Sequence, residues 1–312
     1  MKKNIITLLL SAAFMAAPGF LATAQPKSDL IPTQTVLLYP EGQNVDMGLA
    51  GCAGPGSSNG ITEPESTDKH GAVRNIGDKA RVDLYFPKKG NGQLVVICPG
   101  GGYQYVSSYN EGIYVAEWLL SQGIAAAVVK YRMPNGHCDI PLTDVQNAIR
   151  YCRNNADTWK IKSIGIMGFS AGGHLAASAS NLFTDDITRP DFSVLIYPVI
   201  SMDRSITHTG SRNSLVGKDK KAEGIYSMEN RVSRKTPPTF IVHCSDDKTV
   251  PVANSIIYYS ELVKNNVYAE MHIYPSGGHG WGFTTGNKGR DGIGYVRHEF
   301  EESLARWLDE VR

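Results

Sequence analysis

The sequence predicts a doubly wound α/β fold with a mostly parallel central sheet. From about residue 80 to the end of the chain, strand patterns alternate with helix patterns. Some of the strand patterns, such as residues 94–98, are continuous apolar runs, which are typical of strands covered on both faces. The helix patterns between them are long enough to cross back over a sheet, so consecutive strands can run in the same direction.

The individual elements follow from the spacing of apolar residues. Residues 81–86 alternate polar and apolar side chains, which predicts a half-exposed strand. Residues 113–121 gather apolar side chains on one helical face, and Gly123 closes this helix. The remaining predictions are strands at 124–129, 164–167, 194–197, 240–243 and 270–274, and helices at 144–154, from 171, at 252–264 and at 299–309.

Three segments depart from this rhythm. Residues 1–24 combine a basic start, a short apolar run and a small-residue ending, which predicts a cleaved signal peptide and a periplasmic or secreted protein; a retained membrane anchor is the alternative. Residues 25–312 are then predicted to form one domain. Its first part, 25–80, has no clear period and is expected to be irregular. Residues 201–238 are polar and interrupt the strand pattern, either as a cap insertion over a site or as a surface loop.

The charge and cysteine content exclude some classes of partner. The 31 Lys and Arg residues balance 30 Asp and Glu residues, so neither nucleic acid nor an anionic membrane is expected as a partner. The five cysteines show no metal-ligand spacing, so no metal is expected. Cys98 and Cys244 lie in strand-like runs and are expected to be buried thiols, whereas Cys138 and Cys152 are the first candidates for a disulfide. The oligomeric state is not predicted.

The strongest chemical motif spans residues 168–172, Gly-Phe-Ser-Ala-Gly, between a predicted strand and a predicted helix. A tight strand-to-helix turn exposes a serine hydroxyl, and flanking glycines keep Cβ atoms out of the crowded turn. The start of the helix also favours developing negative charge. Ser170 is therefore the candidate nucleophile.

A nucleophilic serine needs a base and a carboxylate that orients it. His279 follows a predicted strand and lies among glycines, which would let its ring approach Ser170. Asp247 follows the strand at 240–243 and is the preferred carboxylate; Asp246 is its competitor, with a role in holding loop amides as the alternative. The chain order Ser170, Asp247, His279 is the order of α/β-hydrolases.

A glycine run at residues 99–103, Pro-Gly-Gly-Gly-Tyr, follows the strand at 94–98. Backbone amides in such a loop can bind the oxyanion of an acyl-transfer reaction, and we assign the donors to Gly101 or Gly102 and to Ala171. The run lacks the spacing of nucleotide-binding loops, so no organic cofactor is expected. Tyr103 and Trp281 flank the expected pocket, where they either stack on a sugar or pack the loops.

These motifs together resemble the bacterial esterases of the α/β-hydrolase fold that include acetyl xylan esterases and feruloyl esterases. The resemblance runs from about residue 82 to the C-terminus and rests on residues 99–103, 168–174, 246–251 and 277–282. It implies a serine carboxylic-ester hydrolase that removes acyl groups from plant polysaccharide. The alternatives are an esterase or lipase acting on small soluble esters, and a serine peptidase of the prolyl-oligopeptidase type.

Overall fold

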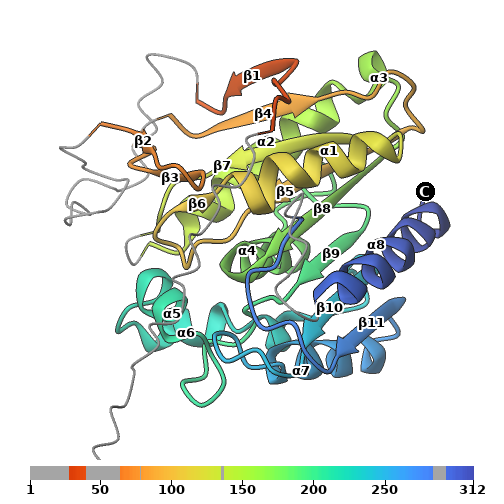
Figure 1. The fold of residues 1–312 in the computed structure, drawn as a ribbon. Helices are drawn as coiled ribbons and strands as arrows, with labels where there is room; N and C mark the ends of the chain where they lie inside the picture. Colours follow the sequence, from red (N-terminus) through yellow and green to blue (C-terminus); the bar gives the residue numbers. More distant parts are fainter. Residues whose placement is uncertain (1–27, 40–63, 78, 135–136, 284–292) are drawn as a thin grey trace, which may run out of the picture.

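A computed structural model describes residues 28–39, 64–77, 79–134, 137–283 and 293–312. An eight-stranded sheet forms its centre, and the six strands from β7 to β11 in spatial order are all parallel (Figure 1). The strands lie in the order β1 (Gln34–Leu37), β4 (Arg81–Tyr85), β7 (Ala125–Lys130), β5 (Gln93–Cys98), β8 (Ser163–Phe169), β9 (Ser193–Ile196), β10 (Thr239–Cys244) and β11 (Ala269–Tyr274). The predicted doubly wound, mostly parallel sheet is confirmed.

Helices cover both faces of the sheet (Figure 1). One face packs against α2 (Asp139–Asn154), α4 (Ser170–Asn181) and α7 (Ala253–Lys264), and the other against α1 (Tyr114–Ser121) and α8 (Ile293–Glu310). Successive residues of β5 alternate between the two cores: Val96 joins the first, whereas Val95 and Ile97 join the second. Because both faces are covered, residues 94–98 of this strand are apolar, as the sequence indicated.

The direction of winding reverses at β5. The chain passes from β5 to β7 on one side, and then crosses to β8 on the other side of β5. In open α/β sheets, ligands bind beyond the carboxyl ends of the strands at such a reversal. The ends of β5 and β8 are therefore the expected place of a site.

The N-terminal part of the domain contains more regular structure than its sequence indicated. Strand β1 pairs antiparallel with β4, and β2 (Ser66–Thr67), β3 (Ala72–Arg74) and β6 (Val106–Ser107) form a small second sheet. Because β4 lies between β1 and β7, residues 82–85 are buried, and the prediction of a half-exposed strand is wrong. Its polar Asp83 is paired with Lys130 and accepts a hydrogen bond from Thr35. The predicted signal peptide lies outside the described residues.

The predicted pairing of Cys138 with Cys152 is wrong. Cys138 caps the first turn of α2, and Cys152 lies near the other end of the same helix. A helix rises about 1.5 Å per residue, so their Cα atoms are roughly 20 Å apart, about three times the reach of a disulfide. The Cys138 thiol instead donates to the carbonyl of Leu215 (3.1 Å). The four described cysteines, Cys98, Cys138, Cys152 and Cys244, are buried free thiols.

The polar segment at 201–238 lies between β9 and β10. It contains α5 (Thr209–Leu215), α6 (Lys220–Ile225) and the short 3₁₀ turn η2 (Met228–Arg231). Its residues His208 and Gly210 border the pocket described below, so the first part of the insertion reaches the carboxyl end of the sheet. None of the described helices is both long and apolar enough to cross a membrane.

Candidate active site

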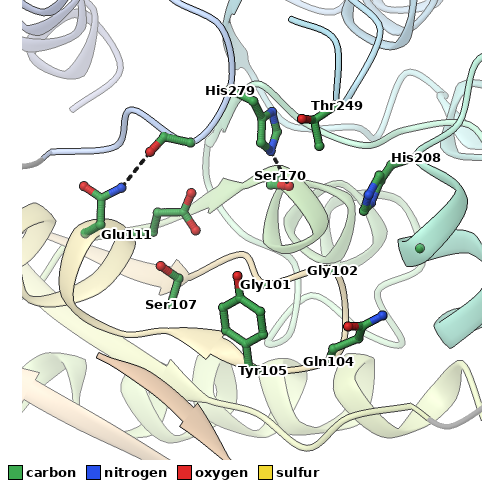
Figure 2. A pocket seen from close by; sticks show the side chains of 13 residues that line it. Gly101, Gly102, Gln104, Tyr105, Ser107, Glu111, Ser170, His208, Thr249 and His279 are labelled. Atoms are coloured by element: carbon green, nitrogen blue, oxygen red, sulfur yellow. Dashed lines mark hydrogen bonds between the residues drawn. The ribbon is translucent and has the colours of Figure 1, made fainter. Parts of the chain in front are cut away.

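Four loops meet beyond the carboxyl ends of the parallel strands (Figure 2). Ser170 directly follows β8, and the glycine run Gly100–Gly102 follows β5. Asp247 and His279 follow β10 and β11. The structure thus brings together residues that are more than a hundred positions apart in the sequence, because all of these strands run in one direction.

Ser170 stands on a tight turn between β8 and α4. Its φ of +53° is in the left-handed region that non-glycine residues seldom adopt, as expected of a nucleophile elbow. The turn fits only because Gly172 has no side chain: a Cβ there would lie 2.1 Å from the carbonyl oxygen of Cys98. The local sequence therefore forces the serine hydroxyl outward, toward the pocket that it lines.

A chain of hydrogen bonds joins Ser170, His279 and Asp247. The Ser170 hydroxyl lies 2.9 Å from Nε2 of His279 (Figure 2), and Nδ1 of His279 lies 2.6 Å from Oδ2 of Asp247. A carboxylate can only accept, so the imidazole carries its proton on Nδ1 and leaves Nε2 free to accept from the serine. This arrangement can take the proton of Ser170 while its oxygen attacks an electrophile.

The structure distinguishes the two adjacent aspartates. Asp246 accepts a hydrogen bond from the amide of Gly278 (2.8 Å) and holds the loop that carries His279. Asp247 receives the amides of Thr249 (2.8 Å) and Val250 (2.9 Å) on its other oxygen, Oδ1. Asp247 therefore contacts the imidazole, and Asp246 has the amide-binding role that the sequence left open for it.

A second histidine, His243 in β10, holds Asp247 from behind. Nε2 of the fully buried His243 lies 3.1 Å from Oδ2 of Asp247 and 3.0 Å from the carbonyl of Val250, and Nδ1 faces the Ser255 hydroxyl. Burial raises the pKa of Asp247, but the hydrogen bonds from His243 and His279 and the charge of His279 outweigh it, so the pKa is held well below its usual range. Asp247 is thus kept as a carboxylate.

The glycine run lies beside Ser170 and presents free amides. Gly101 has a φ of +130°, and a Cβ there would lie 2.1 Å from the carbonyl oxygen of Tyr105, so no larger residue fits this turn. Among the described residues, the amides of Gly101 and Gly102 have no hydrogen-bond acceptor. The amide of Ala171 is in the first turn of α4, where helical amides lack an internal partner. Gly101 and Gly102 line the pocket together with Ser170, and the amide of Ala171 directly follows that serine.

The two aromatic residues predicted to meet a sugar do not line the pocket. Tyr103 is buried, and its hydroxyl lies 2.8 Å from Nδ1 of His174. Trp281 packs behind the site against the rings of Tyr197 (4.9 Å) and Phe300 (5.2 Å). The prediction that Tyr103 and Trp281 contact the substrate is therefore wrong. Both residues pack the loops, which is the alternative that the sequence left open.

The pocket has a volume of about 450 Å³, and polar and apolar atoms contribute to its lining in similar measure. Apart from the carboxylate of Glu111, the lining residues are glycines or carry side chains that can form hydrogen bonds. They are Gly101, Gly102, Gln104, Tyr105, Ser107, Asn110, Glu111, Ser170, His208, Gly210, Thr249, His279 and Gly280. Within the described part of the chain, no three His, Cys, Asp or Glu residues are arranged to hold a metal ion.

Comparison with known proteins agrees with this geometry. The BD-FAE family model matches residues 82–189, which contain the glycine run and Ser170. Acetylxylan esterase of Xylanibacter ruminicola is 41% identical over 247 residues, which cover 76% of this chain and 50% of that protein. The chain thus spans half the length of this curated relative.

Two solved structures extend the likeness over most of this chain. An acetyl ester-xyloside bifunctional hydrolase from Caldicellulosiruptor lactoaceticus is 31% identical with a TM-score of 0.73, over 91% of this chain and 98% of that one. An α/β-hydrolase enzyme from a Medee basin deep-sea metagenome is also 31% identical, with a TM-score of 0.59, over 74% and 92% of the two chains. The chain belongs to the α/β-hydrolase family of esterases.

Several pocket residues of this α/β-hydrolase could not be found from its sequence. Tyr105, two positions after Tyr103, supplies the aromatic wall, and the guanidinium of Arg74 lies 4.6 Å from its ring centre. His208 comes from the insertion. It is the N-cap residue of α5, and its Nδ1 accepts a hydrogen bond from the amide of Ser211. None of these residues lies in a recognisable motif. A polar insertion after β9 was the one signal that pointed toward His208.

Proposed function

We propose that this α/β-hydrolase is a serine esterase that removes acyl groups from hemicellulose, with acetylated xylan as the substrate class. The observation that carries the proposal is the hydrogen-bonded chain from Ser170 through His279 to Asp247, next to free amides of the glycine run. The relatives named above support the substrate class, because one is named an acetylxylan esterase and another an acetyl ester-xyloside bifunctional hydrolase.

The reaction proceeds in two acyl transfers. Ser170 attacks the ester carbonyl while Nε2 of His279 takes its proton, and Asp247 stabilises the imidazolium that forms. The amides of Gly101 or Gly102 and of Ala171 hold the negative charge that develops on the carbonyl oxygen. His279 then returns the proton to the leaving alcohol, and the same residues activate water to hydrolyse the acyl-enzyme.

The pocket lining suits a sugar as the alcohol portion of the ester. Tyr105 offers an aromatic surface, and its ring is held in place by Arg74. His208 accepts the Ser211 amide on Nδ1, so its proton is on Nε2 and can be donated to a hydroxyl group. Gln104 and Ser107 add further uncharged hydrogen-bonding groups.

Export is part of the proposal, since a polysaccharide does not enter the cell. The signal peptide predicted for residues 1–24 supports a periplasmic or secreted enzyme. Cell fractionation followed by N-terminal sequencing tests this point, with a mature chain that begins near residue 25 as the expected result. Retention of the full-length chain in the cytoplasm would contradict it.

One variant tests the chemistry. Ser170→Ala should lose nearly all hydrolysis of p-nitrophenyl acetate and all labelling by a fluorophosphonate, while the wild-type protein is labelled once, at Ser170. Unchanged hydrolysis in the variant would refute the assignment. The substrate class is tested with acetylated xylan, feruloyl and butyryl esters and a proline-containing peptide amide. The highest kcat/KM is expected on acetylated xylan, and a preference for the peptide would favour the peptidase alternative.

A further test separates recognition of the sugar from chemistry. Tyr105→Ala should raise KM for acetylated xylo-oligosaccharides and leave p-nitrophenyl acetate hydrolysis nearly unchanged, because the ring lines the pocket away from the hydrogen-bonded chain. Tyr105→Phe keeps the ring and serves as the matched control. Equal effects of Tyr105→Ala on both substrates would argue against a sugar contact.

A further inference from the structure

One buried carboxylate at the site has no part in the chemistry proposed above. Glu111 lies in the π-helical turn η1 (Tyr109–Ile113), is 5% exposed, and borders the pocket (Figure 2). Burial raises its pKa, opposed by the hydrogen bonds it receives from Tyr197 and Gly100 and by the nearby charge of His279. A buried carboxyl group is costly unless its oxygens are paired, so its partners indicate its purpose.

Its two oxygens reach two different parts of the site. Oε2 accepts the amide of Gly100 (2.8 Å), which begins the glycine run. Oε1 accepts the hydroxyl of Tyr197 (2.9 Å), a fully buried residue just after β9. The Tyr197 oxygen in turn accepts the amide of Gly282 (2.9 Å), three positions after His279. A continuous line of hydrogen bonds thus joins the glycine run to the loop of the histidine.

The turn η1 and the ring of Tyr197 make further contacts with the loop that carries His279. The Asn110 side chain donates to the carbonyl of Gly280 (2.9 Å), and the main-chain carbonyl of Asn110 accepts the amide of Phe283 (3.0 Å). The Tyr197 ring centre lies 4.8 Å from that of His279. Both loops are rich in glycine, which allows the backbone many conformations, so the distance between Gly101 and His279 depends on contacts that fix the two loops.

We propose that Glu111 and Tyr197 act together as positioning residues that set the distance between the oxyanion donors and His279. The inference rests on the proposed esterase function. Neither residue touches the reacting atoms. Oxyanion donors act over a range only about 0.4 Å wide, and a misplacement of about 1 Å costs on the order of 100-fold in rate. A carboxylate is required at position 111 because both of its partners donate.

The change Glu111→Gln replaces one acceptor by a donor. The Gly100 amide cannot rotate, so the glutamine oxygen should stay with it and the NH₂ group should face Tyr197. The Tyr197 oxygen, which already accepts from Gly282, then has no acceptor for its own proton. Tyr197→Phe breaks the same line at its centre without a change of charge, and remains informative if Glu111→Gln fails to fold.

The experiment measures kcat and KM for p-nitrophenyl acetate and the affinity for a trifluoromethyl ketone, which adds to a serine hydroxyl and forms a tetrahedral oxyanion. Each variant should lose roughly 10- to 100-fold in kcat, with little change in KM. The affinity for the ketone should weaken in parallel with kcat/KM. The double variant should be no worse than the poorer single variant, because both break one line of contacts.

The matched control is Glu229→Gln, since Glu229 is another glutamate whose pKa is raised by burial and which hydrogen-bonds a side chain, Ser201, away from the pocket. It should keep wild-type kcat. Variants at positions 111 and 197 that lose thermal stability but keep kcat and ketone affinity would overturn the proposal, as would strictly additive effects. Failure of the esterase function itself would show separately, as a wild-type protein that neither turns over the ester nor labels at Ser170.

Discussion

Replacement of Asp247 by asparagine should remove nearly all turnover and leave the fold intact. One carboxylate oxygen of Asp247 accepts the amides of Thr249 (2.8 Å) and Val250 (2.9 Å). The backbone fixes these two donors, so the asparagine oxygen must take that position. Its NH₂ group then faces Nδ1 of His279, where the carboxylate oxygen accepts at 2.6 Å in the wild-type protein.

The size of the effect follows from the position of one proton. An NH₂ group can only donate, so it stabilises the imidazole of His279 with the proton on Nε2. That nitrogen lies 2.9 Å from the Ser170 hydroxyl and can then no longer accept its proton. The equivalent change in the Ser-His-Asp template lowers kcat by about 10⁴-fold, and we expect a loss of that order. KM should change little, because Asp247 does not line the pocket.

The assay compares kcat for p-nitrophenyl acetate between the wild-type protein and the variant, with circular dichroism as the check on folding. Asp246→Asn is the matched control, since asparagine can still accept the Gly278 amide that Asp246 holds. Comparable kcat values for the wild-type protein and Asp247→Asn would refute the reasoning. A larger loss in Asp246→Asn would show that the two aspartates have been assigned the wrong way round.

Three further outcomes are expected. Burial lowers the pKa of His174 to about 4, so the unfolded state, with a histidine pKa of about 6.5, takes up the proton first as the pH falls. The contribution of His174 to the free energy of unfolding should therefore drop by about 2 kcal/mol between about pH 7 and pH 5. Urea unfolding should show a smaller drop for His174→Gln than for the wild-type protein over this pH range. An equal drop in the two proteins would contradict this. Gly101→Ala should lower kcat on the order of 100-fold or more, because its Cβ would lie 2.1 Å from the Tyr105 carbonyl oxygen and φ is +130°; an active, folded variant would argue against this loop as the oxyanion site. Alkylation of the unfolded, unreduced protein should label both Cys138 and Cys152, and a peptide linked through the two would contradict the free thiols.

The fold and the reacting residues could be predicted from the sequence because their signals are local. Continuous apolar runs predicted the strands of the central sheet from residue 81 onward to within two residues, whereas the helices predicted at 144–154 and 299–309 begin earlier, at residues 139 and 293. Glycines on either side of Ser170 and His279 marked turns that only such residues allow. Since the strands are parallel, motifs at the ends of different strands had to meet at one edge of the sheet.

The residues around this chemistry depended on contacts between distant segments, which no local pattern contains. Tyr103 and Tyr105 look alike in the sequence, but a left-handed turn at Tyr103, with a φ of +58°, directs that ring inward to His174 and leaves Tyr105 to line the pocket.

The sequence by itself determined the fold class and, through short glycine motifs, the positions of Ser170 and His279, because backbone geometry at a tight turn is a local property. Only the tertiary structure decided that Asp247 rather than Asp246 meets the imidazole and that His243 supports it. It also decided that Glu111 and Tyr197 connect the two loops. The direction of a hydrogen bond between side chains far apart in the chain is settled by packing, and packing is a property of the whole fold.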